Sequence, residues 1–148
     1  MFKLMLKVMI PVYIFLYRLT GGAIGGQIQG LPVLLLTTIG RKSGQPRTVP
    51  LGFLRDGSTY VIIASNAGLP RYPAWFLNLQ SHPEATIQMK RLQVQVKAET
   101  ANPEKKRELW ARLMEVAPGY ADYQKRTSRD IPMVILHPED HRGEQRSA

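Results

Sequence analysis

The chain has 148 residues, no cysteine and a formal net charge of +9. A length of this order holds one domain, and 44% hydrophobic against 21% charged residues excludes a disordered chain. The missing cysteines exclude a disulfide scaffold, a cysteine zinc site and a cysteine nucleophile, and they fit a reducing compartment.

Positive charge is concentrated toward the N-terminus. Residues 1–55 hold seven Lys and Arg and no acid, and the first acid is Asp56. This uneven distribution of charge attracts anions, for example a phosphorylated cofactor, an anionic lipid or a nucleic acid. Composition does not choose among these three classes of partner.

Residues 1–20 are apolar with a few cations. The uncharged run 8–17 is shorter than the roughly 20 residues that a membrane span needs. Three interpretations remain open: a helix at a membrane surface or against a partner, a helix that covers a sheet edge, and a cleaved signal peptide. Pro11 interrupts the run but suits the first turn of a restarted helix. We expect residues 21–138 to form one domain and 139–148 to be a polar tail.

The next segments predict an antiparallel meander. Its strands are expected over 31–39, 47–54 and 59–65, joined by the glycine-rich turn 40–46 and by Asp56-Gly57. Pro50 cannot donate to a ladder, which predicts an edge position or a bulge.

The second half of the chain alternates between strands and short helices. Strands are expected over 85–89, 92–98 and 132–136, and helices over 74–78, 102–116 and 120–127. Asn102 and Pro103 suit the N-cap and first position of their helix, and Pro118-Gly119 ends it. Six short strands with hairpin turns predict a mainly β (α+β) fold, a closed or split β-barrel with peripheral helices.

The turn at residues 40–47 is the first candidate for chemistry. Its two glycines allow backbone N–H groups to converge on an anion, and Arg41, Lys42 and Arg47 add positive charge. The spacing of a phosphate-binding P-loop is absent and a strand follows, which excludes that motif. A basic hairpin tip in water remains the alternative.

The second candidate is the loop that begins at Ser65 and leads into the helix expected from Ala74. The start of that helix presents free N–H donors, Trp75 could stack on a flat ring, and Ser65 could hydrogen-bond such a ring. A tryptophan of the core is the alternative interpretation.

Tyr120 and Tyr123 form the third candidate. A spacing of three places both phenols on one helical face, where they can pack a flat substrate and donate a proton. Two aromatics that merely cover the barrel mouth are the alternative.

Metal and nucleic-acid sites have no support in the pattern. His137 and His141 are separated by Pro138 and lack a third ligand, and no aromatic stripe is interleaved with Arg and Lys. We therefore expect neither a metal nor a nucleic-acid partner.

The stretch 34–47, LLLTTIGRKSGQPR, resembles the deazaflavin (F420)-dependent nitroreductase family of actinobacteria, in particular its F420H2-dependent quinone reductase type. Further matches in order and spacing follow over 56–65, 73–83 and 118–132, and the resemblance spans residues 25–138.

The resemblance implies a split β-barrel of the flavin-reductase, FMN-binding type with coenzyme F420, an 8-hydroxy-5-deazaflavin, in a basic groove. Its phosphate and acidic tail would lie on Arg41, Lys42 and Ser43. The deazaflavin would be lined by Arg47, Thr48, Val49, Pro50, Leu51, Gly52, Ile63, Ala64, Ser65, Asn66, Ala74, Trp75, Phe76, Leu77 and Asn78.

The implied reaction is hydride transfer from reduced F420 to a planar conjugated acceptor, namely a quinone, an enone or a nitroaromatic compound. Ser65, Tyr120 and Tyr123 would act on the acceptor side. Gly52 and Ala117 stand where the best-known nitroreductase of the family has tyrosines, which predicts a wider pocket and favours a quinone. A non-catalytic F420 or lipid binder and an FMN-dependent reductase on the same barrel are the alternatives. The expected location is cytoplasmic, with residues 1–20 available for peripheral contact with the inner face of the cell membrane.

Overall fold

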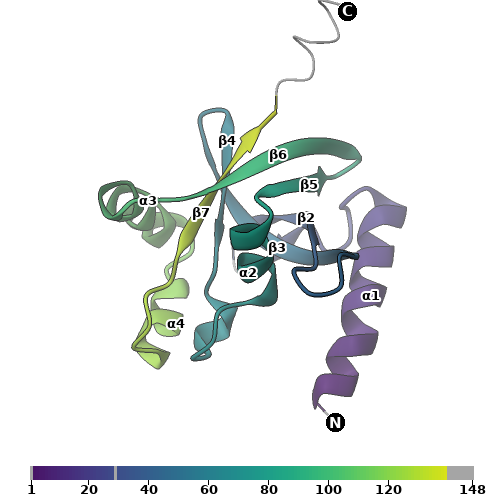
Figure 1. The fold of residues 1–148 in the computed structure, drawn as a ribbon, viewed down its shortest axis with the longest axis horizontal. Helices are drawn as coiled ribbons and strands as arrows, with labels where there is room; N and C mark the ends of the chain where they lie inside the picture. Colours follow the sequence, from purple (N-terminus) through teal and green to yellow (C-terminus); the bar gives the residue numbers. More distant parts are fainter. Residues whose placement is uncertain (1, 29, 140–148) are drawn as a thin grey trace, which may run out of the picture.

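A computed structural model of the protein describes residues 2–28 and 30–139. In chain order the elements are α1 (Phe2–Thr20), β1 (Gln27–Ile28), β2 (Leu31–Ile39), β3 (Pro46–Asp56), β4 (Thr59–Ile63), the 3-10 turn η1 (Asn66–Gly68), α2 (Ala74–Ser81), β5 (Glu84–Met89), β6 (Leu92–Thr100), α3 (Pro103–Val116), α4 (Tyr120–Arg126) and β7 (Met133–Pro138) (Figure 1). Residues 140–148 of the expected polar tail lie outside the described residues.

The strands form one antiparallel sheet that closes on itself. Their order is β1-β2-β3-β4-β7-β6-β5, and the additional pairing of β2 with β5 closes the six strands from β2 onward into a barrel. The predicted barrel and its opening meander, β2-β3-β4, are confirmed. Pro50 pairs with Leu35 of β2, whereas β3 pairs with β4 only from Phe53 onward. On the side that faces away from β2, Pro50 therefore has no strand partner that would need its missing N–H.

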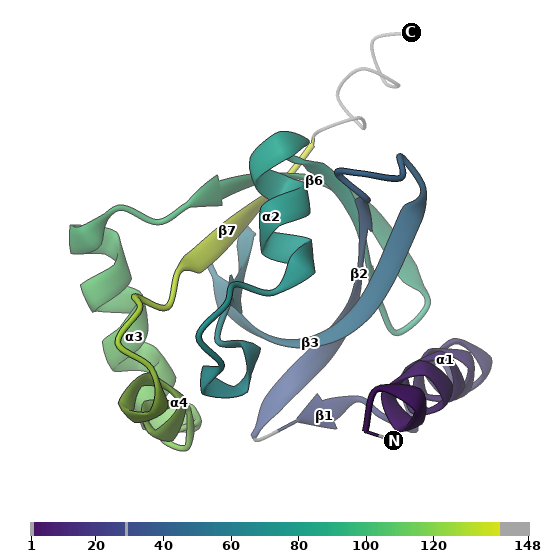
Figure 2. The same cartoon turned by 60° about the horizontal axis from the view of Figure 1, so that its bottom comes forward.

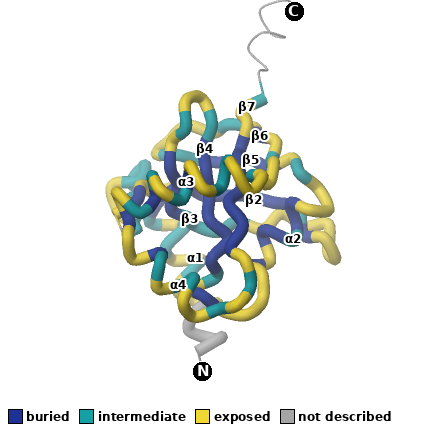
Figure 3. The backbone as a smooth tube through the Cα atoms, turned by 90° about the vertical axis from the view of Figure 1, so that its left-hand side faces the viewer, coloured by how far each residue is buried: buried dark blue, intermediate teal, exposed yellow. Residues whose placement is uncertain are grey.

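Strand β2 is buried on both faces, which explains its continuous apolar run. Leu34 and Leu36 belong to the core inside the barrel, together with Trp75 and Phe76 of α2. The alternate residues Val33 and Leu35 pack outward, under α1. Figure 2 shows α2 lying across the barrel, and Figure 3 shows buried residues running through the central strands while the turns around them are exposed.

Helices α3 and α4 cover a second part of the outer barrel face. Leu109, Leu113 and Tyr120 pack there on residues of β4 and β7. The side chain of Asn102 accepts a hydrogen bond from the Lys105 N–H at 2.8 Å, so the predicted N-cap is confirmed.

Helix α1 combines a packed face and an exposed face. Tyr17, only 1% exposed, donates its hydroxyl proton to the Val33 carbonyl at 2.9 Å. This face of α1 therefore packs on the sheet, but on the outer face of β2, which is paired on both sides, and not on a sheet edge as one of the three interpretations expected. The helix runs through Pro11 instead of restarting there. Because proline has no N–H, one backbone carbonyl of the preceding turn lacks its helical partner, and since Pro11 is exposed this carbonyl can bond to water. None of the helices in residues 2–28 and 30–139 has the length and apolarity to cross a bilayer.

Several predicted boundaries were wrong by a few residues. Strand β3 is longer than the expected 47–54 at both ends. Helix α2 continues beyond Asn78 to Ser81 because Leu79 still packs into the barrel core. The two-residue strand β1 and the turn η1 were not predicted; both are too short to leave a periodic pattern.

Candidate functional site

A hollow of about 560 Å³ lies between the β2-β3 hairpin and the beginning of α2. Most of the predicted residues of the basic turn and of the tryptophan helix meet in it, although more than 25 residues of sequence separate the two segments. The hollow is lined by Thr38, Gly40, Arg41, Lys42, Ser43, Pro46, Arg47, Thr48, Val49, Ala74, Trp75 and Asn78.

The polar end of the hollow is the hairpin tip. Its turn is closed by two backbone hydrogen bonds of 2.8 Å between Gly40 and, respectively, Gln45 and Gly44. A Cβ at Gly40 would lie 2.6 Å from the Ser43 hydroxyl oxygen and 3.3 Å from the Gln45 carbonyl oxygen, so a side chain at this position would displace the Ser43 hydroxyl. The same hydroxyl accepts hydrogen bonds from the Gln45 N–H at 3.1 Å and the Arg47 guanidinium at 3.4 Å.

Three cations stand exposed around this tip. Arg41, Lys42 and Arg47 all line the hollow, and none of its lining residues is acidic. Positive charge without a neighbouring carboxylate in the wall is suited to hold a phosphate or carboxylate group.

Asn78 of α2 fixes the hairpin to the helix. Its side-chain oxygen accepts the Arg41 backbone N–H at 3.0 Å, and its side-chain nitrogen donates to the Thr38 hydroxyl at 3.0 Å. Since a backbone N–H can only donate, the orientation of the amide is determined. Asn78 and Thr38 are 5% and 1% exposed, so these bonds are shielded from water and preset the backbone of the cationic turn.

Another part of the wall of the hollow is apolar. Trp75 is 7% exposed, packs edge-on against Phe76 at 6.3 Å between ring centroids, and also lines the hollow beside Val49 and Ala74. The two interpretations of Trp75, core residue and site residue, are therefore compatible.

The remaining residues predicted for the cofactor do not line the hollow. Ile63 and Ala64 are 5% and 0% exposed within the core. The others outside its wall are Pro50, Leu51, Gly52, Ser65, Asn66, Phe76 and Leu77. Gly40 and Pro46, which belong to the candidate turn 40–47, also line the hollow. Thr38 lines it without having been predicted as a site residue; the hairpin register, which pairs Thr38 with Arg47, would have been the signal.

The structure differs from the expected widening at Gly52 and Ala117. A Cβ at Gly52 would lie 3.1 Å from the Leu31 side chain and 3.2 Å from the Tyr120 hydroxyl. Ala117 is 2% exposed in the core under α3. The space beside Gly52 is thus already filled by Leu31 and Tyr120, and a small residue there opens no room.

The residues predicted for the acceptor side lie outside the hollow, just after the C-terminal end of β4 and on α4. Ser65 follows β4 and is 8% exposed. The rings of Tyr120 and Tyr123 meet edge-on at 5.5 Å. Burial, and secondarily the neighbouring Tyr123, raises the pKa of Tyr120 to about 12, so its hydroxyl stays protonated at neutral pH.

Known proteins resemble this chain in sequence and in fold. A protein of Mycobacterium tuberculosis named F420H(2)-dependent quinone reductase is 44% identical over 125 residues, which cover 82% of this chain and 84% of that protein. A solved F420-H2 dependent reductase, FDR-A, superimposes with a TM-score of 0.65 at 34% identity, covering 72% of this chain and 94% of the other. A structure described as a domain-swapped dimer gives a TM-score of 0.67 at 30% identity over 86% of this chain and 93% of the other.

The family model of F420H(2)-dependent quinone reductases matches residues 12–138. At the level of the family, the predicted split barrel, the cofactor F420 and the class of reductase are confirmed. By this match over most of its length, the chain belongs to the F420H(2)-dependent quinone reductase family.

Proposed function

We propose that this chain binds F420 in the hollow between the β2-β3 hairpin and α2 and reduces a planar conjugated acceptor, foremost a quinone. One observation carries this function: a single hollow joins a cationic turn, preset by Asn78, to a wall that contains Trp75. The 44% identical mycobacterial reductase supports the reaction class, and also an actinobacterial source.

The lining residues fit such a cofactor in their chemistry. An acidic tail is matched by Arg41, Lys42 and Arg47 in one part of the wall, and a flat apolar ring is matched by Trp75 and Val49 in another. The close approach of Ser43 to Gly40 keeps the hairpin tip compact, so the three cations stay within reach of one ligand.

In this mechanism the protein supplies orientation, electrostatics and exclusion of water. F420, when bound in its reduced form, supplies the hydride. Trp75 and Val49 shield the reacting ring from water. The hydroxyls of Ser65 and Tyr120 donate hydrogen bonds to the acceptor oxygen as negative charge develops there, and Tyr123 shapes the acceptor wall. The quinone gains one hydride and one solvent proton and leaves as hydroquinone.

Titration with F420, followed by intrinsic tryptophan fluorescence, tests the site. Lys42→Ala removes a partly exposed cation, and we expect the F420 dissociation constant to rise roughly tenfold. Lys97→Ala, on the exposed surface of β6, is the matched control and should leave binding unchanged. An unchanged constant in Lys42→Ala would show that the tail binds elsewhere.

Reduced F420 mixed with menadione tests the activity. Oxidation of the cofactor that depends on both protein and quinone is the expected result. Binding of F420 without turnover, with any quinone, enone or nitroaromatic compound, would instead support a non-catalytic carrier and exclude the proposed reaction.

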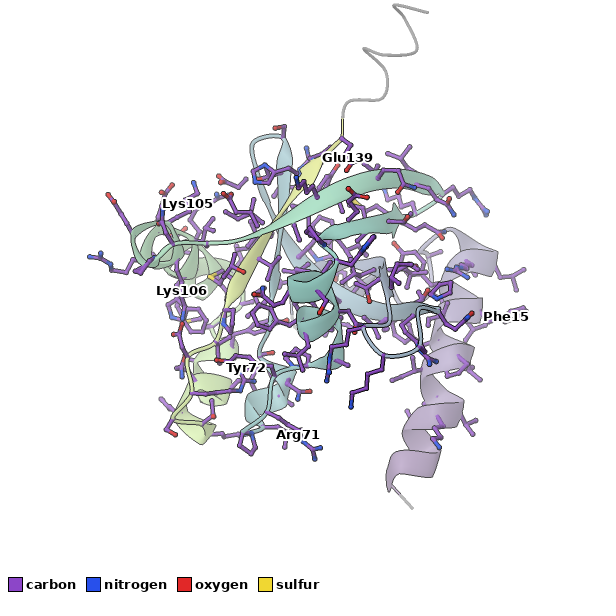
Figure 4. All side chains as sticks on the ribbon, in the orientation of Figure 1. Phe15, Arg71, Tyr72, Lys105, Lys106 and Glu139 are labelled. Atoms are coloured by element: carbon purple, nitrogen blue, oxygen red, sulfur yellow. The ribbon has the colours of Figure 1, made fainter. Side chains whose placement is uncertain are left out.

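We infer further that α1 rests on the inner surface of the cell membrane. Its exposed face carries Val8, Val12, Phe15 and Leu19, which are 50–63% exposed and recur at helical spacing; Figure 4 shows Phe15 pointing away from the molecule. Arg18, also exposed, suits anionic headgroups beside this stripe.

Sedimentation with vesicles that contain anionic lipid tests this contact. Wild-type protein should sediment with such vesicles and Phe15→Asp should not, while both retain F420 binding. If wild-type protein stays in the supernatant, or if Phe15→Asp abolishes a dimer and not vesicle binding, the membrane contact is excluded.

A further inference from the structure

Arg129, between α4 and β7, binds the loop that follows β4 through several backbone carbonyls. Its Nε donates to the Leu69 carbonyl at 2.9 Å, Nη1 to Ala64 at 3.1 Å and Nη2 to Ser65 at 2.8 Å. A further bond of 3.1 Å reaches the carbonyl of Asp130. The guanidinium thus joins both ends of the loop segment 64–69 to the segment that precedes β7.

The loop held in this way has an unfavourable backbone. Asn66, Ala67 and Gly68 have φ values of 46°, 54° and 77°, a run in the left-handed region where two of the three residues carry a Cβ. Such conformations persist only where the surroundings hold them. Within the loop, the Gly68 N–H donates to the Ser65 carbonyl at 2.9 Å, the Leu69 N–H to the Asn66 carbonyl at 3.0 Å and the Asn66 side-chain amide to the Arg71 carbonyl at 2.9 Å. The segment is tied to the rest of the chain by the Ala64 N–H, which donates to the Pro132 carbonyl at 2.9 Å, and by the three bonds from Arg129.

Two neighbouring elements meet the same loop. A Cβ at Gly68 would lie 2.8 Å from the Tyr123 carbonyl, so α4 packs directly against η1. The Arg129 guanidinium also lies 4.9 Å from the centroid of the Tyr72 ring, and Tyr72 packs at 5.2 Å against Phe76, the neighbour of Trp75. Arg129 therefore connects Ser65, the tyrosine helix α4 and the helix that carries the wall of the hollow.

From these contacts we infer that Arg129 is a positioning residue that holds Ser65 at a fixed place relative to Tyr120 and Tyr123 on the acceptor side. The inference rests on the proposed function for the role of Ser65. This role requires a guanidinium, because its planar array of N–H donors can bind several carbonyls in different directions at once. A lysine ammonium at this position keeps the charge but cannot reach all of these carbonyls.

Hydrogen exchange at the amides of Gly68 and Leu69 tests the restraint without any cofactor. In Arg129→Gln and in Arg129→Lys we expect exchange at both amides to accelerate roughly tenfold or more, the size of losing one charge-assisted hydrogen bond. Arg71→Lys is the matched control, since Arg71 lies in the same loop, is exposed and is seen at the outer edge of the molecule in Figure 4. Tyr72→Leu removes the ring that lies against the guanidinium, together with its contact to Phe76, and gives a milder form of the same test should the Arg129 variants not fold.

Steady-state kinetics with reduced F420 and menadione test the connection to the acceptor. The Arg129 variants should raise the KM for menadione and lower kcat, while the F420 dissociation constant stays within about twofold of wild type.

Wild-type exchange rates in Arg129→Lys would show that charge alone suffices, and equal acceleration in Arg71→Lys would show a general loosening; either result overturns the inference. Faster exchange with unchanged menadione kinetics overturns the link to the acceptor. If the wild-type protein does not turn over at all, the proposed function fails, and the exchange comparison still decides whether Arg129 holds the loop.

Discussion

Single side chains determine the shape of this site through buried and partly buried hydrogen bonds. Asn78 is the clearest case, because one amide holds the Arg41 backbone and the Thr38 hydroxyl at the same time. The sequence identified the exposed cations and Trp75 by their chemistry, and the resemblance placed Asn78 beside the cofactor. No local pattern, however, indicated that the Asn78 amide would bond to a hairpin 37 to 40 residues earlier in the chain.

Asn78→Ala should therefore loosen the cationic turn. The buried Thr38 hydroxyl and the partly buried Arg41 N–H lose their partner, which is expected to lower the free energy of unfolding by about 1–3 kcal/mol and to weaken F420 binding. Urea denaturation and the F420 titration measure the two effects. Ser81→Ala, at an exposed position on the same helix, serves as control; an equal loss in both variants would contradict the role of Asn78.

Gly52 is the residue at which the sequence-based prediction failed, because a missing side chain predicts space only if nothing else fills it. Gly52→Ala should lower stability by about 1–3 kcal/mol through crowding against Leu31 and Tyr120. Removing the hydroxyl in the double variant Gly52→Ala, Tyr120→Phe should restore part of this loss, as measured by urea denaturation. If Gly52→Ala is as stable as wild type, the site beside Gly52 is open after all; if the second change restores nothing, Leu31 and not the Tyr120 hydroxyl causes the crowding.

At the scale of the elements, an ion network joins the β3-β4 hairpin to α3. The Asp56 carboxylate lies 2.9 Å from the Lys105 ammonium and 2.9 Å from the Arg112 guanidinium. The hydrogen bond from Lys105 is the main cause that lowers the pKa of Asp56, with Arg112 contributing less. The N-cap at Asn102 fixes the start of α3 and so presents these cations to the hairpin.

This network predicts a defined dependence of stability on pH. Because the pKa of Asp56 is lower in the folded state, its contribution is full above the ordinary carboxyl pKa of about 3.9 and is lost as pH falls through the lowered value. Asp56→Asn should be less stable than wild type at neutral pH, and the two should converge in acid. Urea denaturation over this range measures it, with Glu115→Gln on α3 as control. A difference that stays constant with pH would contradict the ionic origin.

Over the whole molecule, the net charge of +9 and the acid-free N-terminal part favour association with an anion. We expect F420 to bind more weakly as salt rises, since charges are screened over about 10 Å at 0.1 M ionic strength and about 3 Å at 1 M. Lys42→Ala should show a shallower salt dependence than wild type in the same titration. Binding that does not change with salt would mean that the apolar wall, and not the cationic turn, dominates affinity.

The sequence by itself determined the meander, the basic turn, the N-cap of α3 and the membership in the family, because alternation, turn residues and capping residues act over a few neighbouring positions. Only the tertiary structure decided that β5 closes the barrel on β2, that α1 is continuous through Pro11, that Gly52 is covered, and that Arg129 holds the loop after β4. These features depend on contacts between residues far apart in the chain; Arg129 and Ser65, for example, are 64 positions apart. Local sequence preferences cannot select such partners, because many side chains of the same kind could form an equivalent contact. The closed barrel determines which of them actually meet.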